Sequence, residues 1–478
     1  MSAVARNLVL IVLVVLPPVL SHAQSGTGAY NTAVGSLTLS NNSTGEANTA
    51  VGHQSLFDNT TGGANTGIGV NALFSNTGGY WNTAIGLNAL YFNTTASWNT
   101  AIGSYALHSN TAAWNTALGG SALQTNTTGE ANTAVGGQAL LSNTVGRENT
   151  AVGVNALYGN TQGSWNTALG STALSSNTNG ELNTAVGMSA LRNNTIGLWN
   201  TALGAQALYC NDIGTLNVAV GNDALVCNTG GSGNVAVGVG ALKFNTTGTA
   251  NIAIGTWAGV YATTGIYNIY IGNNGVGGES NTIRIGFNPE QTKTFVAGIR
   301  GTTTGMNDAV PVVIDSNGQL GTINSSQRFK EDIHDMGDLS RSLLRLRPVT
   351  FRYTQPFADG EKPVQFGLIA EEVAEVMPEL VARDANGQPE TVKYQLLAPM
   401  LLNEVQKQQR TIEAQVQQIA AQAAEIESQA GQLADLQARL IRLETLSRQV
   451  SSAGLSVENP NVSVAHEPDP GSNALSFH

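Results

Sequence analysis

The chain has 478 residues, of which only 11% are charged and 6% aromatic, with 55 glycines and a formal net charge of -11. An ordinary globular enzyme of this length would bury more large side chains, whereas a disordered chain would not contain 41% hydrophobic residues. The acidic balance argues against nucleic-acid binding, which depends on lysine and arginine contacts with phosphates. The composition favours a repetitive structural protein with a small conventional module attached.

Residues 1–23 have the pattern of a secretory signal peptide. Arg6 supplies the positive charge, and the apolar run over residues 8–16 is followed by a small-residue cleavage site that ends at Ala23. A non-cleaved membrane anchor is the alternative, but the apolar run is too short to span a bilayer. We therefore expect a secreted or cell-surface protein that has no transmembrane anchor after the signal is removed.

Residues 24–289 form a ladder of near-identical units. Each unit contains the motif Asn-Thr-Ala-Val-Gly or a close variant, and successive motifs are 17 residues apart, with one step of 16 between Asn99 and Asn115. The alternation of small and apolar residues favours a short strand, and Gly and Asn-Thr mark turns. The motif asparagines are Asn31, Asn48, Asn65, Asn82, Asn99, Asn115, Asn132, Asn149, Asn166, Asn183, Asn200, Asn217, Asn234, Asn251 and Asn268.

A unit of this length is too short for a helical hairpin but fits one coil of a β-solenoid. Stacked coils repeat every ~4.8 Å, so the asparagines should form ladders that satisfy backbone groups in the turns. In these motifs the ladder resembles the head repeats of trimeric autotransporter adhesins, whose units are typically shorter. The predicted fold class is mainly β, with a β-solenoid followed by a small α+β module and a C-terminal coiled-coil helix, assembled as a trimer.

Five tryptophans precede a motif asparagine and should form one column on the solenoid. Such a column is either an aromatic strip that binds a glycan or a cell-surface receptor, or a set of rings that stack to stabilise the coils. We favour stacking. The tryptophans are Trp81, Trp98, Trp114, Trp165 and Trp199.

The two cysteines, Cys210 and Cys227, lie one unit apart in the same phase. Neighbouring coils would place their Cα atoms ~5 Å apart, which is within the range of a disulfide. Export from the cytoplasm favours the bond, so we predict a disulfide, with two unpaired buried thiols as the alternative.

Residues 290–324 alternate between strand-like and turn-like stretches. The tetrapeptide Asp315-Ser316-Asn317-Gly318 is a hairpin turn signal. We interpret this segment as a β neck. From Ser325 onward, charged residues occur in nearly every short window, which marks the start of a different module.

The module over residues 325–394 is recognised by three sequence blocks. They read SSQRFKEDI at 325–333, LRPVTFRY at 346–353 and FGLIAEEV at 366–373, and the third is followed by MPELV and VKY. In this order and after a fibre-like ladder, the blocks resemble the C-terminal intramolecular chaperone of phage tailspikes, the peptidase S74 family. The resemblance extends over about residues 325–405 and implies a domain that trimerises and then cuts itself from the preceding fibre.

The family resemblance implies a catalytic serine and a lysine five residues later, which are Ser325 and Lys330 here. The cleaved bond would then join Asn324 to Ser325. A lysine whose pKa is lowered by burial can activate a serine hydroxyl, and attack on the adjacent peptide bond would occur once per chain. Arg328 is a candidate for orienting the site. The residue after the serine is often aspartate in the family but is Ser326 here, which leaves a second hydroxyl as an alternative nucleophile.

Residues 395–446 carry a heptad pattern that predicts a coiled coil, three-stranded as the family resemblance implies. A single helix that folds back on the module is the alternative. Residues 447–478 lack periodicity and are predicted to be a flexible tail. The first core position holds Val405, Ile412, Ile419, Ile426, Leu433 and Leu440, and the second holds Gln408, Gln415, Gln422, Gln429, Leu436 and Leu443.

Together these patterns predict a secreted trimeric, adhesin-like fibre whose C-terminal chaperone drives trimerisation and is released by autoproteolysis before Ser325. The alternative is a purely structural surface or matrix fibre whose trimerisation module does not cleave. The enzymatic activity would be limited to a single-turnover serine endopeptidase. The expected partners are further copies of the chain and a glycan or receptor, whereas no metal ion, cofactor or nucleic acid is expected.

Overall fold

The computed structural model describes residues 28–287, 289–384 and 386–453, and the chain divides into two units, residues 1–297 and 298–478. The predicted signal peptide and residues 454–478 of the predicted tail lie outside the described residues. Within the described ranges, no helix combines the length and the apolar character that crossing a membrane requires.

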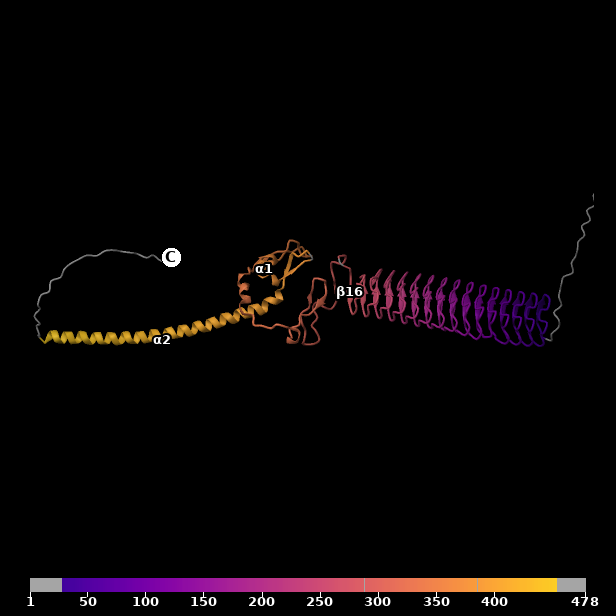
Figure 1. Ribbon diagram of the computed structural model, residues 1–478, viewed down its shortest axis with the longest axis horizontal. Helices are drawn as coiled ribbons and strands as arrows, with labels where there is room; N and C mark the ends of the chain where they lie inside the picture. The colour runs from indigo at the N-terminus through magenta and orange to yellow at the C-terminus, as the bar shows by residue number, and fades with distance from the viewer. Residues whose placement is uncertain (1–27, 288, 385, 454–478) are drawn as a thin grey trace, which may run out of the picture. The chain divides into compact units, whose positions relative to one another are not determined.

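The first unit is a β-solenoid, as predicted, in which every coil contributes one three-residue strand to a single parallel sheet (Figure 1). The strands pair in chain order and in register, so that Thr32 lies opposite Thr49. They are β1 (Thr32–Val34), β2 (Thr49–Val51), β3 (Thr66–Ile68), β4 (Thr83–Ile85), β5 (Thr100–Ile102), β6 (Thr116–Leu118), β7 (Thr133–Val135), β8 (Thr150–Val152), β9 (Thr167–Leu169), β10 (Thr184–Val186), β11 (Thr201–Leu203), β12 (Val218–Val220), β13 (Val235–Val237), β14 (Ile252–Ile254), β15 (Ile269–Ile271) and β16 (Ile283–Ile285).

The core of the solenoid is made of repeated small and branched side chains. The middle residue of nearly every strand is a buried alanine, and most coils add a second alanine followed by a buried leucine, such as Ala156 and Leu157. Each fully buried leucine contributes about 1.5–3 kcal/mol relative to exposure. The narrow alanines let the opposite walls of a coil approach each other, so a short unit can enclose its own core.

Two asparagine ladders run through the solenoid and confirm the predicted role of these residues. The backbone N–H of Asn65 donates to Oδ1 of Asn48 at 3.0 Å, and Nδ2 of Asn48 donates to the Gly62 carbonyl at 2.9 Å. In the second ladder, Nδ2 of Asn59 donates to Oδ1 of Asn42 at 2.7 Å. These amides satisfy buried turn groups, each of which would otherwise cost about 1–3 kcal/mol.

The single 16-residue step is absorbed in a turn and leaves the sheet unchanged. Asn115 lies five positions after Asn110, whereas the corresponding Asn99 lies six positions after Asn93. Nδ2 of Asn110 accordingly donates to a carbonyl two residues ahead, that of Ala112, at 2.7 Å. Strands β5 and β6 still pair in register, because the missing residue lies outside both the strand and the core.

The solenoid ends in a polar cap. The middle residue of β15 is the buried Tyr270, which pairs with Ala253 on one side and with Arg284 of β16 on the other. The guanidinium of Arg284 binds the Glu279 carboxylate through Nη2 at 2.7 Å and Nε at 2.9 Å. At the position where nearly all other coils have alanine, the last two strands have a tyrosine and then an arginine. These larger side chains close the core, and the arginine makes the last strand a poor template for another strand.

The cap also perturbs the titration of its acidic groups. Burial opposes ionisation of Glu279, but the hydrogen bonds and charge of Arg284 outweigh it and lower the pKa of this carboxyl. Burial, followed by the charge of Glu279, raises the pKa of Tyr270. The Tyr270 hydroxyl itself makes no hydrogen bond in the structure.

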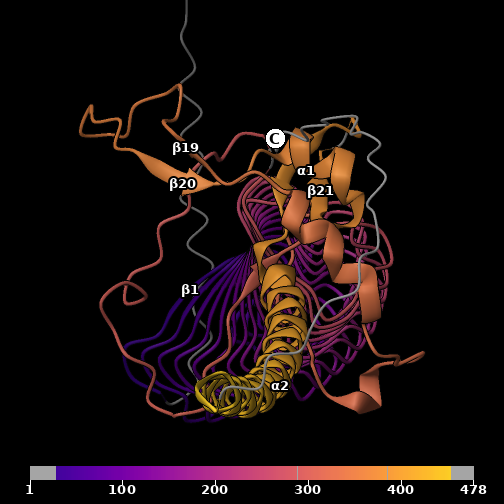
Figure 2. The same cartoon turned by 90° about the vertical axis from the view of Figure 1, so that its left-hand side faces the viewer.

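The first strands of the second unit form the predicted hairpin, β17 (Val313–Ile314) and β18 (Leu320–Gly321). Asp315 stabilises its turn, because its Oδ1 accepts the Asn317 and Gln319 N–H groups, both at 2.9 Å. Two further hairpins and one long helix follow (Figure 2). The elements are η1 (Gln327–Phe329), η2 (Gly337–Arg345), β19 (Val349–Phe351), β20 (Gln365–Gly367), α1 (Ala370–Val376), η3 (Pro378–Leu380), β21 (Val381–Arg383), β22 (Pro389–Val392), η4 (Tyr394–Leu396) and α2 (Leu397–Ser452).

Helix α2 has 56 residues and extends six residues past the predicted end at 446. A small core joins its first turn to the rest of the unit, where Leu397 and Met400 pack against the buried residues. Those buried residues are Leu343, Val373, Met377, Leu380, Val381 and Val392. The α1 helix and the β21–β22 hairpin therefore form a compact body around the start of α2.

We predict that Gly153→Ala destabilises the solenoid, whereas Gly137→Ala does not. Gly153 has φ +138°, and a Cβ atom there would lie 2.5 Å from the Gly170 carbonyl oxygen of the next coil. The backbone strain alone should cost about 1–3 kcal/mol. A Cβ at Gly137 meets nothing within 4 Å. Thermal unfolding followed by circular dichroism checks this, and equal midpoints for the two variants would contradict it.

We predict that Glu279→Gln weakens the cap at neutral pH but not in acid. Because the folded-state pKa is lowered, the carboxylate contributes stability above its unfolded pKa of about 4.3 and loses it as pH falls through the folded value. Urea unfolding of parent and variant should therefore differ most at neutral pH, and the difference should shrink as the pH falls from about 4.3 through the lower folded-state pKa. The exposed Glu290→Gln is the control and should match the parent at every pH.

Candidate functional site

The predicted cleavage segment lies between β18 and η1 in the second unit. Ser325 and Lys330 flank a single 3-10 turn, in which the Phe329 N–H donates to the Ser326 carbonyl at 3.1 Å and the Lys330 N–H donates to the Gln327 carbonyl at 3.0 Å. Both predicted catalytic side chains and Asn324 are exposed. The two predicted catalytic residues therefore lie at either end of one short turn, and both side chains are open to solvent.

The structure does not join the two side chains of the dyad. No hydrogen bond links Ser325 to Lys330, and both residues belong to the described part of the chain. The Arg328 guanidinium carbon lies 5.1 Å from the centre of the Phe329 ring, so this arginine contacts an aromatic face. A serine without an adjacent base is a weak nucleophile, so the single chain contains the two predicted dyad residues without pairing them.

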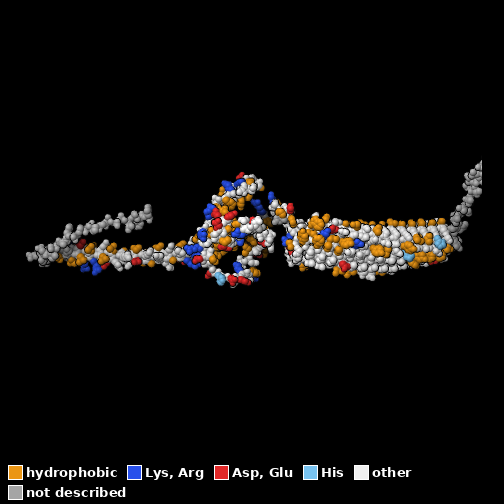
Figure 3. Space-filling model, turned by 45° about the horizontal axis from the view of Figure 1, so that its top comes forward, with side chains coloured by type: hydrophobic (Ala, Val, Ile, Leu, Met, Phe, Trp, Pro, Cys, Tyr) orange, Lys and Arg blue, Asp and Glu red, His pale blue; other side chains and the backbone are white. Residues whose placement is uncertain are grey.

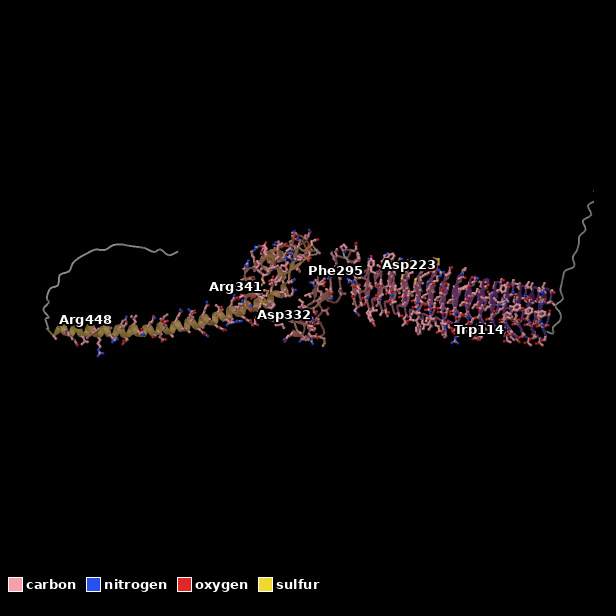
Figure 4. The ribbon with its side chains drawn as sticks, in the orientation of Figure 1. Trp114, Asp223, Phe295, Asp332, Arg341 and Arg448 are labelled. Carbon is pink, nitrogen blue, oxygen red and sulfur yellow. The ribbon has the colours of Figure 1, made fainter. Side chains whose placement is uncertain are left out.

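A turn with unusual backbone geometry follows the segment. Asp332 has φ +51°, in the left-handed region that few residues other than glycine adopt. Asp332, labelled in Figure 4, lies between η1 and η2 along the chain. The segment from Ser325 to Lys330 thus contains one 3-10 turn, is followed by the turn at Asp332, and has no buried side chain in η1.

The other two sequence blocks have structural roles in the module. Arg347, from the second block, forms a bidentate ion pair with Glu372 of α1, from the third. The hydrogen bond from Arg347 lowers the pKa of the Glu372 carboxyl. The Tyr394 hydroxyl accepts the Leu368 N–H at 2.9 Å and so holds the end of β20 close to the start of α2. These motif residues hold elements of the module together.

A polar network that the sequence did not reveal joins η2 to α2. The buried Ser340 hydroxyl donates to Oε1 of Glu404 at 2.6 Å, and Lys407 donates to the same oxygen at 2.9 Å. Asn403 donates to the Ser340 hydroxyl at 2.6 Å. Glu404 is the one buried residue of α2, and the Ser340 bond, followed by Lys407, lowers the pKa of its carboxyl. The network fixes the direction in which the long helix leaves the module.

Beyond this network, the heptad positions of α2 are exposed. Both predicted core positions are open to solvent along the helix, with Ile426 65% exposed and Leu443 63% exposed. The module also exposes apolar side chains near the cleavage segment, including Phe329 and Ile333, and Phe366 on the β20 strand is 81% exposed. The single chain therefore presents a long apolar seam that it does not cover itself.

The predicted tryptophan column exists, but its members do not all stack. Trp81 and Trp98 stack with ring centres 4.4 Å apart and planes 19° apart, and Arg147 lies over Trp165 at 5.0 Å. The stacked pair favours the stabilising interpretation, since stacked rings cover each other's faces and present their edges to water. Trp114, labelled in Figure 4, is 59% exposed.

A second aromatic column was missed in the sequence. Phe57 stacks on Phe74 with ring centres 5.1 Å apart, Phe74 on Tyr91 at 4.9 Å, and Tyr91 on His108 at 5.5 Å. Burial lowers the pKa of His108 at the end of this column. The recurrence of aromatic residues every 17 positions was the available signal.

The two cysteines are recorded as free thiols, and both are partly buried. Burial, followed by the neighbouring Cys227, raises the pKa of Cys210. The predicted disulfide between them stays a prediction. Across residues 28–287, 289–384 and 386–453, no group of three or more His, Cys, Asp or Glu is placed to hold a metal ion.

The fold defines a solenoid followed by a small module that leads into a long helix with an uncovered apolar seam. Residues 325–382 of this module match the peptidase S74 family, described as the chaperone of endosialidase. The segment is therefore a chaperone domain of that family, and the match begins at the predicted nucleophile, Ser325. It ends before the position near 405 to which the resemblance was expected to extend. No curated protein matches the chain.

We predict that Ser340→Ala lowers the thermal stability of the module and of α2. The substitution leaves the Glu404 carboxylate with one donor fewer in a buried position, where an unsatisfied charged acceptor is costly. Circular dichroism at the helix wavelength reports α2, because α2 holds most of the helical residues in the described chain. Ser342→Ala, in the same helix but only partly buried, is the control. Equal melting of both variants would contradict a structural role for the network.

Proposed function

We propose that this protein is a secreted, trimeric, adhesin-like fibre whose C-terminal segment from Ser325 is an intramolecular chaperone. The chaperone aligns three chains and is then released by one autoproteolytic cut between Asn324 and Ser325. The mature fibre would contain residues 24–324, and the released piece residues 325–478. The family match to a chaperone domain directly after a solenoid carries this proposal.

The uncovered seam of α2 supports association of several copies. A helix of 56 residues with one buried residue lacks the packing from which helices in proteins gain most of their stability. Aliphatic residues at every seventh position supply the apolar seam of a coiled coil, and the glutamines at the second core position form polar layers that favour one register. A second and a third copy would bury this seam along its length.

The repeats explain why such a fibre requires an aligning domain. Neighbouring coils have nearly the same sequence, so two solenoids could associate one coil out of step at little cost. An association domain at the C-terminal end sets the alignment before the repeats meet. Its removal afterwards would make unfolding irreversible, since released chains would lack the domain that aligned them.

Trimerisation would also complete the cleavage site. The single chain leaves Ser325 and Lys330 exposed and not bonded to each other, and Phe329 and Ile333 beside them are exposed apolar residues. Packing of these apolar residues against another copy would exclude water from the segment and bring a base to the serine hydroxyl. Cleavage would then follow assembly rather than precede it.

A glycan or a cell-surface receptor is the proposed ligand of the fibre. The support is the exposure of Trp114 and Trp199, whose neighbours at the same position in the next coil are Ala131 and Leu216 rather than another ring. An aromatic face not covered by a second ring can pack against the apolar face of a sugar. The secretory pattern of residues 1–23 supports an extracellular location for that contact.

We predict that the full chain yields two fragments on a denaturing gel and that Ser325→Ala yields one. The N-terminus of the smaller fragment should be Ser325, because its hydroxyl attacks the Asn324 carbonyl, the C–N bond breaks as an ester forms, and water then hydrolyses that ester. Ser326→Ala is the matched control and should cleave normally. Lys330→Met should abolish cleavage, because it removes the base.

Sedimentation of the same samples separates the alternatives. An uncleaved parent that sediments as a trimer would leave a structural fibre with a permanently attached association module. An uncleaved monomer would refute both the cleavage and the chaperone role. Cleavage in Ser325→Ala but not in Ser326→Ala would move the nucleophile to Ser326.

A further inference from the structure

The outward face of the solenoid sheet has a composition that changes along the fibre. In every strand the middle residue points inward, while the first and third residues face outward and are partly or fully exposed. The third residue is Val, Ile or Leu in all strands from β1 to β16. The first residue is Thr in β1 to β11 but Val or Ile in β12 to β16.

The third-position residues form an uninterrupted apolar row from β1 to β16, and neither outward position holds a charged residue. Single exposed aliphatic residues are ordinary, but an uninterrupted row marks an interaction surface. A sheet with one face in water normally places polar residues outward. In this sheet only strands β1 to β11 do so, through the threonine at the first position of each strand. Figure 3 shows rows of hydrophobic side chains along the solenoid. In the last strand, Ile283 is 66% exposed and Ile285 is 71% exposed.

We propose that this outward face is the surface along which the solenoids of separate copies of this chain pack, and that β12 to β16 are where the packing is strongest. The proposal rests on the proposed trimeric fibre. We name the five strands β12–β16 the apolar zone and β1–β11 the threonine zone.

A second copy of the chain is the partner that fits this face. A partner must offer apolar groups at each step of ~4.8 Å along the whole solenoid, and a parallel copy does so at every level. The face has no charges that would repel an identical face. The apolar zone is also the part of the solenoid nearest in sequence to the chaperone domain that begins at residue 325. Association set up by that domain would therefore reach the apolar zone first.

The boundary between the two zones also distinguishes the correct alignment of neighbouring solenoids from alignments shifted by one or more coils. Solenoids aligned level by level place every apolar strand against an apolar strand. A slip of one coil between two chains places one apolar level of one chain against a threonine level of the other, which leaves buried hydroxyl groups opposite methyl groups. The repeats are otherwise nearly identical, so this boundary distinguishes the correct alignment from the slipped ones.

Photo-crosslinking in the full chain tests the surface. A benzoylphenylalanine at Val237, in the apolar zone, should link chains to one another on a denaturing gel, as should one at Ile426 in the seam of α2. The same group at Ile213, an exposed turn position of the solenoid, should not. Links at Ile426 without links at Val237 would overturn the face and keep the trimer. Links at Val237 without links at Ile426 would keep the face and overturn the coiled coil, and links at neither position would overturn both.

Substitutions test the strength of the apolar zone. The triple variant Val218→Thr, Val235→Thr and Ile252→Thr should lower the yield of Val237 links severalfold, because it extends the threonine zone. The matched control makes the same change at the exposed turn residues Val145, Ile196 and Ile213 and should leave the yield unchanged. If both triple variants lower the yield equally, the effect is on folding and the zone is refuted.

A gain-of-function variant keeps the test independent of misfolding. Thr167→Val, Thr184→Val and Thr201→Val lengthen the apolar zone by three strands. The oligomer of this variant should dissociate at a higher urea concentration than the parent. An unchanged or lower midpoint would overturn the proposal that the outward first position determines association.

Discussion

The alignment of each coil with the next is the constraint on which this structure depends. Every strand pairs in parallel and in register with its neighbours, and the backbone of each turn hydrogen-bonds to the same position of the next coil. Any change in coil length must therefore be absorbed in a turn, as it is between Asn110 and Asn115. The close approach of successive turns excludes a side chain at Gly153, and the buried asparagines replace the hydrogen bonds that water would make.

The same regularity makes it hard for separate chains to align with one another, and in the proposed fibre the second unit performs this alignment. A ladder in which every step is alike carries little information about which step of one chain meets which step of another. The polar cap of Glu279 and Arg284 limits growth at the end of the solenoid, but it does not align separate chains. In the proposed fibre, the second unit, which is held together by its own small core, would supply that information independently of the repeats.

The second unit has its own small core and a fixed start of α2, but it leaves much apolar surface uncovered. Its core has six buried hydrophobic residues, and Ser340, Glu404 and Lys407 hold the start of α2 against it. The rest of the helix and the Phe366 face of the β19–β20 hairpin stay open. This combination is the one expected of a domain that folds first as a single chain and completes its packing when copies meet.

The sequence by itself determined the features that depend on local pattern. The coil period, the strand positions, the asparagine ladders, the Asp315 hairpin and the start of the chaperone domain at Ser325 follow from residues close together in the chain. Only the tertiary structure decided features that join distant residues. The Ser340–Glu404 bond spans 64 residues, and the Phe57 column and the Tyr270 cap depend on which side chains the stacking brings into contact. Sequence spacing places Ser325 near Lys330 along the chain, but only the tertiary structure shows that their side chains are exposed and not bonded to each other.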